Sequence, residues 1–264
     1  SLVGSEMCIR DRSPTNENQS WLDRRFYWSP DSRWLVAIEE TRPDERTIYM
    51  VESSPKDQLQ PKLHEMRYVK PGDAIRTEKP RLFDTSSGKE IQVEDHLFEN
   101  PWRINDYRWR EDSSEFVFFD NQRGHQAVRL LAIQPETGEV RAIIDETTDS
   151  FVDYTNKVFR REIPETGEII WMSERSGWNH LYLYDEASGK VKNAITQGDW
   201  VVREVDQVDL EKRQIWFQAS GMVPGEDPYQ IHFCRVDLDG QNLVRLTDGD
   251  GTHEIQYSPN RRYL

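Results

Sequence analysis

A turn that ends in glycine recurs along the sequence at an almost constant interval. The four glycines of these turns are separated by 50, 51 and 51 residues, and they are Gly88, Gly138, Gly189 and Gly240. Glycine adopts a positive φ at little cost, so each turn is expected to reverse the chain between two strands. So regular a spacing restricts the chain to a repeat architecture, in which one structural unit is copied along the sequence.

The third repeat shows the content of this unit most clearly. It opens with an apolar strand, Ile169–Met172, and passes a polar turn into an alternating strand. In that alternating strand His180, Tyr182 and Tyr184 share one face. After the glycine turn the unit ends in a last strand, Lys190–Ile195. Such a meander cannot bury its apolar faces alone, so it must pack against its neighbours.

Comparable apolar or aromatic strands follow a polar turn in the other repeats, at Trp34–Ile38, Phe116–Phe119 and Ile215–Phe217. Four strands in a period of about fifty residues are typical of a β-propeller blade. Nine tryptophans beside a hydrophobic fraction of only 36% also favour many thin sheets over one thick core. The sequence therefore predicts an all-β fold, a partial β-propeller with about four blades and the start of another.

The residues that precede the first repeat do not follow this pattern. Residues 1–12 (SLVGSEMCIRDR) match no blade and resemble a translated sequencing adapter, so we expect residues 1–20 to be a disordered or artefactual leader. The propeller then occupies residues 21–264, with Arg25–Trp28 as its first strand.

About thirty residues are inserted in the first repeat, between Glu40 and Thr77. The insertion holds four prolines and one expected strand, Thr47–Glu52. A long insertion on a rigid scaffold often carries function, and a hairpin that covers a sheet edge is the alternative interpretation.

Composition excludes several classes of function. The formal net charge of −14 argues against a nucleic-acid or anionic-membrane surface, which needs basic patches. No apolar segment reaches the eighteen or so residues of a membrane span. The two cysteines, Cys8 and Cys234, cannot build a disulfide framework or a zinc site, and Cys234 is expected to be a small buried strand residue.

Candidate chemical residues are sparse. The histidines form no metal-binding pattern and are interpreted as polar strand or turn residues: His64, His96, His125, His180, His232 and His253. Asp248–Gly251 resembles part of a calcium loop without its remaining ligands, and Asp237–Gly240 is explained by turn chemistry. We therefore predict no catalytic, cofactor-binding or metal-binding residue in this chain.

An ordered series of motifs carries a resemblance to a known family. It comprises WSPDSRWLVAI, YVKPGD, EKPRLFD, SERSGWNHLYLYD, ITQGDWVVREVDQVD, DPYQIHFCRVDLDGQNLVRLT and DGTHEIQYSPNRRYL. These motifs resemble the N-terminal propeller of bacterial dipeptidyl peptidase IV-like serine peptidases, of the prolyl oligopeptidase class, over Phe26–Leu264. The resemblance implies an eight-bladed propeller followed by an α/β-hydrolase domain, of which this chain is a truncated fragment. It also implies a periplasmic or extracytoplasmic parent protein.

The same resemblance implies a role. The propeller would gate and dock substrates for a serine exopeptidase that releases N-terminal dipeptides, with peptides that have a free N-terminus and the α/β-hydrolase domain as partners and a homodimer as a candidate assembly. The fragment itself is expected to be inert, because no G-x-S-x-G elbow occurs in it.

The family also holds the substrate ammonium group with a pair of glutamates. The corresponding region here, Thr15–Asp23, has only Glu17, so no binding residue is carried over. This departure keeps an endopeptidase relative open as an alternative. A non-catalytic interaction propeller and a propeller glycosidase, which uses facing carboxylates, are the other classes, although no blade presents an acidic residue in the same distinctive context as the others.

Overall fold

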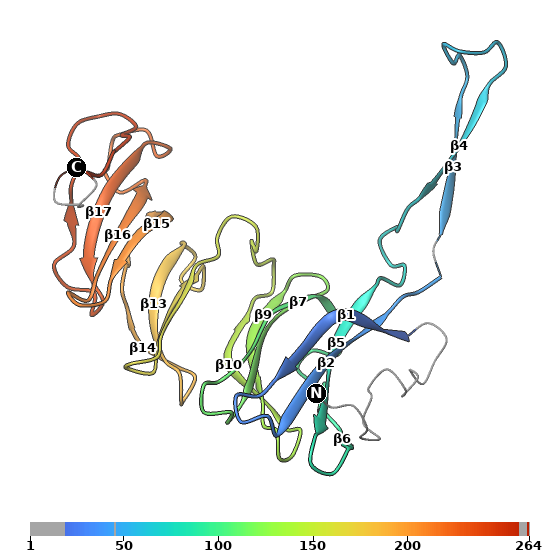
Figure 1. Cartoon of the computed structure of the whole chain (residues 1–264). Helices are drawn as coiled ribbons and strands as arrows, with labels where there is room; N and C mark the ends of the chain where they lie inside the picture. The colour runs from blue at the N-terminus through green and yellow to red at the C-terminus, as the bar shows by residue number, and fades with distance from the viewer. Residues whose placement is uncertain (1–18, 45, 259–262, 264) are drawn as a thin grey trace. The chain divides into compact units, whose positions relative to one another are not determined.

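The computed structural model describes residues 19–44, 46–258 and 263, and the side chains of residues 19–24 are not described (Figure 1). Within these ranges the regular secondary structure consists of strands, and no helix could span a membrane. The leader expected at residues 1–20, with Cys8 and Glu17, lies outside the described residues except for its last two positions. Those two positions open the first strand, β1 (Gln19–Trp28).

Sixteen strands form four antiparallel four-stranded sheets, each a meander in chain order. We call these sheets blades 1 to 4. Blade 1 contains β1 (Gln19–Trp28), β2 (Trp34–Thr41), β5 (Thr77–Asp84) and β6 (Lys89–Ile91). Blade 2 contains β7 (Pro101–Trp109), β8 (Phe116–Gln122), β9 (Ala127–Ile133) and β10 (Val140–Thr147).

The other two blades repeat the same order. Blade 3 contains β11 (Arg160–Ile163), β12 (Glu168–Ser173), β13 (His180–Asp185) and β14 (Lys190–Ala194). Blade 4 contains β15 (Val201–Asp209), β16 (Gln214–Ser220), β17 (Ile231–Asp237) and β18 (Val244–Arg245). Each strand predicted from the sequence lies within one of these strands, apart from Ile195, one residue beyond the end of β14. The all-β fold class is therefore confirmed.

The insertion in the first repeat forms a separate two-stranded sheet, which we call the arm. It consists of β3 (Thr47–Glu52) and β4 (Lys62–Arg67) and extends from blade 1 as a long ribbon (Figure 1). The strand expected at Thr47–Glu52 has the predicted bounds. The strands of the arm pair only with each other and not with an edge strand of a blade.

The chain divides into two compact units. Unit 1 comprises Ser1–Arg123 and Leu131–Arg141, and unit 2 comprises Gly124–Leu130 and Ala142–Leu264. Each unit has its own apolar packing, and the two are described separately here.

In unit 1 blade 1 packs on the first strands of blade 2 through aromatic side chains. The rings of Tyr27 in β1 and Tyr107 in β7 have centroids 5.5 Å apart, and Phe116 in β8 lies 5.6 Å from Tyr27. The indole Nε1 of Trp109 donates a hydrogen bond to the carbonyl of Tyr27 at 2.8 Å. Large aromatic rings thus supply both burial and a specific polar contact at this junction.

In unit 2 blades 3 and 4 share a single hydrophobic core. Its fully buried members come from both sheets and include Ile170, Leu181, Leu183, Ile215, Phe217, Ala219, Cys234 and Val236. Strand β13 is buried on both of its faces except at its last residue. The core therefore lies between the two sheets, as expected for repeats that cannot bury their apolar faces alone.

The turn glycines explain the constant repeat length. All four have positive φ, with values of 67°, 78°, 65° and 84° for Gly88, Gly138, Gly189 and Gly240. A Cβ atom at Gly189 would lie 2.8 Å from the carbonyl oxygen of Ile143, in the last strand of the preceding blade. The same type of contact occurs at two other turns, Gly138 against Gln92 and Gly240 against Ala194. The second, third and fourth repeats therefore dock their glycine turns on the backbone of the repeat before them.

Candidate docking arm and arginine pocket

The arm presents apolar side chains to solvent. Its strands pair in a simple antiparallel register from Thr47 opposite Arg67 to Glu52 opposite Lys62. Ile48, Tyr49 and Val51 are β-branched or aromatic, and such residues favour this extended conformation. Several large apolar side chains of the ribbon are nevertheless exposed: Tyr49 (63%), Met50 (47%), Val51 (67%), Leu63 (60%) and Met66 (41%). In this register Tyr49, Val51 and Leu63 lie on one face of the ribbon and Met50 and Met66 on the other, so both faces of the arm expose apolar surface.

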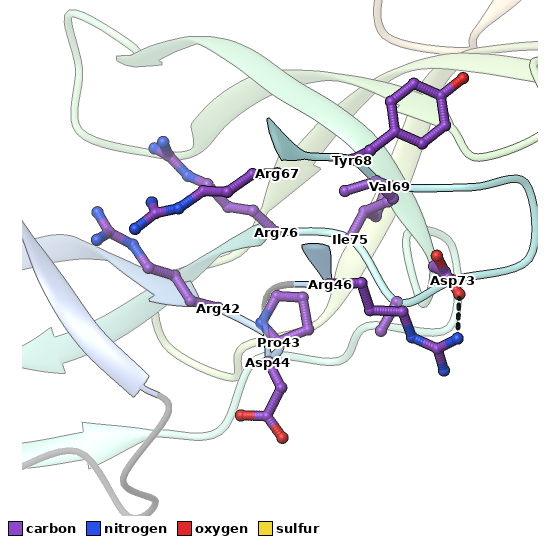
Figure 2. A pocket seen from close by; sticks show the side chains of 11 residues that line it. Arg42, Pro43, Asp44, Arg46, Arg67, Tyr68, Val69, Asp73, Ile75 and Arg76 are labelled. Carbon is purple, nitrogen blue, oxygen red and sulfur yellow. Dashed lines mark ion pairs between the residues drawn. The ribbon is translucent and has the colours of Figure 1, made fainter. Parts of the chain in front are cut away.

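A pocket of about 710 Å³ lies at the root of the arm, where the chain leaves β2, leaves β4 and enters β5 (Figure 2). Its lining includes four arginines against two aspartates, and these six are Arg42, Arg46, Arg67, Arg76, Asp44 and Asp73. Figure 2 shows the side chains of Arg42, Arg67 and Arg76 directed to the same side of the pocket. This wall of guanidinium groups lies in a chain that carries 14 excess negative charges, and carboxylates of Glu40 and Glu78 pair with two of the groups.

A buried carboxylate holds part of this wall in place. The side chain of Glu40, at the end of β2, is 1% exposed and forms ion pairs with Arg42 at 2.9 Å and with Arg76. Arg76 also forms an ion pair with Glu78 at 2.8 Å. Glu78 lies in β5, directly opposite Glu40 of β2 in the strand register. The two arginines are therefore anchored to the sheet of blade 1, although both remain half exposed or more.

The opposite side of the pocket is partly apolar and has its own ion pair. Arg46 lies 3.3 Å from Asp73, the pair marked by the dashed line in Figure 2. Asp73 also accepts a hydrogen bond from the backbone amide of Lys70 at 2.9 Å, which closes the turn before β5. Tyr68 and Val69, both about half exposed, add apolar surface next to the arginines.

The histidines stand mainly as polar strand and turn residues. His64 lies on the arm, 2.9 Å from Glu52. His180 is buried in β13, where Nδ1 shares a hydrogen bond with Thr196 and Nε2 with the carbonyl of Gly198. Burial lowers the pKa of His180 below its usual value and outweighs the opposing bond to Gly198. A neutral, bonded imidazole of this kind is a structural residue.

Two histidines far apart in sequence meet in blade 4. The rings of His232 in β17 and His253 in the loop after β18 have centroids 5.2 Å apart. His232 is 2% exposed, and its Nε2 lies 2.8 Å from a carboxylate oxygen of Glu226. No set of three metal-ligating side chains surrounds them, or any other point, in the described part of the chain.

The remaining candidates have plain structural surroundings. Cys234 is fully buried in β17, as predicted, and burial raises the pKa of its thiol to about 12. The carboxylate of Asp237 accepts hydrogen bonds from Gln214 and Asn242 in its turn. Asp248 is 93% exposed and lies 3.3 Å from Arg245.

The arginine pocket is the feature that sequence reasoning missed. Its arginines are spread over about 35 residues of the insertion, and they follow no known motif. A usable signal was present, because four arginines gather in the one long insertion of an otherwise acidic chain.

The four meandering sheets define the class of fold, a β-propeller built from four-stranded blades. The family model described as "Dipeptidyl peptidase IV (DPP IV) N-terminal region" matches residues 22–264. This chain therefore belongs to the dipeptidyl peptidase IV N-terminal region family.

Individual relatives agree with this family. Dipeptidyl peptidase 4 of Trichophyton rubrum is 27% identical over 217 residues, and that of Trichophyton equinum is 26% identical over 212 residues. Both alignments cover 77% of this chain and 27% of the relative, so the chain spans about a quarter of these proteins. The crystal structure of Porphyromonas gingivalis dipeptidyl peptidase 4 has a similar fold, with a TM-score of 0.61 and 19% identity. That match covers 89% of this chain and 32% of the other.

Proposed function

We propose that this chain is the substrate-docking and substrate-gating propeller of a serine exopeptidase that releases N-terminal dipeptides. The observation that carries the proposal is the family match over residues 22–264, together with four blades that follow the repeat of the sequence. The curated relatives in this family are dipeptidyl peptidases. In a complete propeller of the parent protein, a ring of blades would suit gating, because it admits short or unfolded peptides and excludes folded proteins by size.

In this proposal the covalent chemistry belongs to an α/β-hydrolase domain outside these 264 residues. The sequence has no G-x-S-x-G elbow, and a serine nucleophile needs such an elbow with an acid and a histidine after it. The chain by itself is then catalytically inert, and the parent protein acts on peptides with a free N-terminus.

The test is an assay of the full-length parent protein with Xaa-Pro chromogenic substrates, with and without acetylation of their amino group. Hydrolysis that acetylation abolishes supports a dipeptidyl peptidase, because the free ammonium group is then required for productive binding. Hydrolysis that survives acetylation identifies an endopeptidase relative. Absence of both hydrolysis and labelling by a fluorophosphonate probe would refute the peptidase proposal in favour of a non-catalytic binding propeller. A further control is this 264-residue chain, in which no serine should be labelled.

The arm supports a second part of the proposal, assembly of two copies of the parent protein. An isolated two-stranded ribbon is only marginally stable in water, and β3 and β4 each leave one edge without a neighbouring strand. The ribbon also carries both charge signs, with Glu52 and Lys62 opposite each other in the register at its outer end. A second copy related by a two-fold axis can cover the same apolar surface on both arms at once.

Sedimentation of the full-length protein tests this assembly. Replacing Tyr49 by glutamate places a charge on the face of the arm that Tyr49 shares with Val51 and Leu63, and it should shift a dimer to the monomer. The matched control is Tyr229→Glu, since Tyr229 is 82% exposed in the loop between β16 and β17 and does not belong to the arm. A dimer that persists in Tyr49→Glu, or that is equally weakened in Tyr229→Glu, would contradict assembly through the arm.

A further inference from the structure

One face of the arm gathers two thioethers and an imidazole. In the antiparallel register Met50 lies directly opposite His64, and Met66 follows His64 two positions later on β4. Successive side chains of a strand point to opposite faces, so these three share one face of the ribbon. All three are open to solvent, with exposed fractions of 47% for Met50, 41% for Met66 and 50% for the side chain of His64.

The spacing of these side chains suits a single bound ion. Directly opposite residues have Cβ atoms about 5 Å apart, and diagonal neighbours about 7 Å apart. Met50 and Met66 are diagonal neighbours in the register. Glu52 and His64 have the same diagonal relation one step further along the ribbon, and their side chains are in contact, with Nε2 of His64 2.9 Å from Oε2 of Glu52. Because methionine is long and unbranched, the same relation brings both sulfurs within reach of one point beside the imidazole.

The contact with Glu52 also prepares the imidazole of His64 to act as a ligand. An ionised carboxylate only accepts hydrogen bonds, so Nε2 of the neutral ring carries the proton and Nδ1 has the free lone pair. Metal-binding histidines commonly donate their second ring N–H to a carboxylate in this way, which fixes the tautomer and the ring orientation. Lys62 lies opposite Glu52, and its ammonium group is paired with Asp57, which offsets its charge.

The donor atoms select the type of metal. Thioether sulfur is a soft ligand that suits Cu(I), and imidazole also binds copper, whereas Mg²⁺ and Ca²⁺ prefer oxygen. Among the described residues, histidine, cysteine, aspartate and glutamate alone form no set of three that could hold a metal. The arm differs because two of its three donors are sulfurs of methionine. The net charge of −14 favours the approach of a cation.

We propose that the arm binds one Cu(I) ion through the Sδ atoms of Met50 and Met66 and Nδ1 of His64, with Glu52 as the positioning residue of the imidazole. Tyr49 lies on the opposite face of the ribbon, so copper binding and the assembly tested at Tyr49 use different surfaces. The copper site does not rest on the proposed peptidase function, because all four residues belong to this chain.

Competition with the Cu(I) chelator bicinchoninate, under anaerobic conditions with ascorbate as reductant, measures the affinity of the 264-residue chain for Cu(I). All proteins in this experiment carry Cys8→Ser, so that this thiol does not bind copper. Met50→Leu and Met66→Leu each remove a sulfur at nearly constant volume, and His64→Gln removes the imidazole. Each of the three changes should weaken Cu(I) binding at least about tenfold, the smallest loss usual for residues around a metal.

Two matched controls separate the site from general effects of charge and composition. His96→Gln removes an imidazole that is also exposed (64%) and beside a glutamate, and His96 does not belong to the arm. Glu52→Ala should weaken binding about tenfold, whereas Glu65→Ala makes the same charge change on the opposite face of the arm. Both control changes should alter the affinity less than twofold. Glu52→Ala should also shift the imidazole ¹⁵N resonances of His64 away from those of the Nε2–H tautomer, which Glu65→Ala should leave in place.

Nuclear magnetic resonance of the chain labelled with ¹³C in its methionine methyl groups identifies the ligands directly. The probe is Ag(I), a soft ion that ascorbate and air leave in one oxidation state in the presence of the thioethers over the time of a titration. The methyl resonances of Met50 and Met66 should shift together and saturate at one Ag(I) per chain. Those of Met172 and Met222 should not move, since Met172 is buried in the core of unit 2 and Met222 packs against that core.

Three results would overturn the proposal. The first is a Cu(I) affinity that Met50→Leu and Met66→Leu leave unchanged. The second is an equal loss in His64→Gln and His96→Gln, which would assign the binding to scattered imidazoles. The third is a titration in which Ag(I) shifts other methionine methyl groups and leaves those of Met50 and Met66 in place. A parent protein without peptidase activity would refute the proposed function and leave the copper result standing.

Discussion

Replacing Gly189 by alanine should weaken the contact between successive blades. Gly189 has a φ of 65°, and a Cβ atom at this position would lie 2.8 Å from the carbonyl oxygen of Ile143. Gly167 provides a matched control in the same unit, because its φ is 61° and a Cβ there meets nothing within 4 Å. Both variants place alanine at a positive φ, and only Gly189→Ala also brings its Cβ atom against a backbone oxygen.

The expected magnitudes follow from these two geometries. A side chain in the left-handed region costs about 1 kcal/mol, which is the loss expected for Gly167→Ala. Forcing a methyl group against a packed backbone oxygen costs about 2 kcal/mol more, so Gly189→Ala should lower the free energy of unfolding by about 3 kcal/mol in total. The smaller entropy of the unfolded alanine chain opposes both losses equally, and it cancels in the difference.

Urea denaturation followed by tryptophan fluorescence measures this difference. With a slope of about 2 kcal/mol per molar urea, the midpoint of Gly189→Ala should fall about 1 M below that of Gly167→Ala. Equal midpoints for the two variants would show that turn docking on the neighbouring blade contributes nothing to stability. The glycine would then be required for backbone conformation alone.

Two further predictions concern pH and reactivity. Burial raises the pKa of Glu168, but hydrogen bonds and charge from Arg213 and Lys192 outweigh it and bring that pKa down to about 2. The resulting stabilisation is complete above the ordinary pKa near 4.5 and is lost as the pH falls towards 2. Glu168→Gln should therefore lower the free energy of unfolding by about 2 kcal/mol at pH 7, a value reduced because the ion-pair partners are half exposed. Near pH 2 the variant and the unmodified chain should be equally stable. A loss of stability that does not depend on pH would contradict the ion-pair explanation. In a Cys8→Ser variant the buried thiol of Cys234, with its pKa raised to about 12, should react with a thiol reagent only after unfolding, and rapid labelling of the native chain would disprove its burial.

The local sequence pattern was sufficient to predict most of the strands and turns. Strand identity depends on alternation and turn chemistry within about ten residues, so Thr47–Glu52 and the four glycine turns were predictable from neighbouring positions alone. The constant spacing of the glycines was sufficient to predict the repeat architecture, because a repeated unit must stack on copies of itself. The buried position of Cys234 follows from the same alternation along β17.

Contacts between distant positions came only from the tertiary structure. Arg42 and Arg67 are separated by the whole arm, and the antiparallel ribbon returns the chain to its root and places them on one pocket wall. His232 and His253 meet for a similar reason, since a strand and a later loop of blade 4 converge. No local pattern encodes such proximity, because it depends on the path of the chain between the two residues.

The turn glycines combine both levels. A positive φ at Gly189 follows from its place in a tight turn, and this much can be read along the chain. The carbonyl of Ile143 that a side chain would strike belongs to the preceding blade, and it is brought there only by the packing of one repeat on another. Conformation at this position is a local property, whereas the space available to a side chain is decided by the neighbouring repeat.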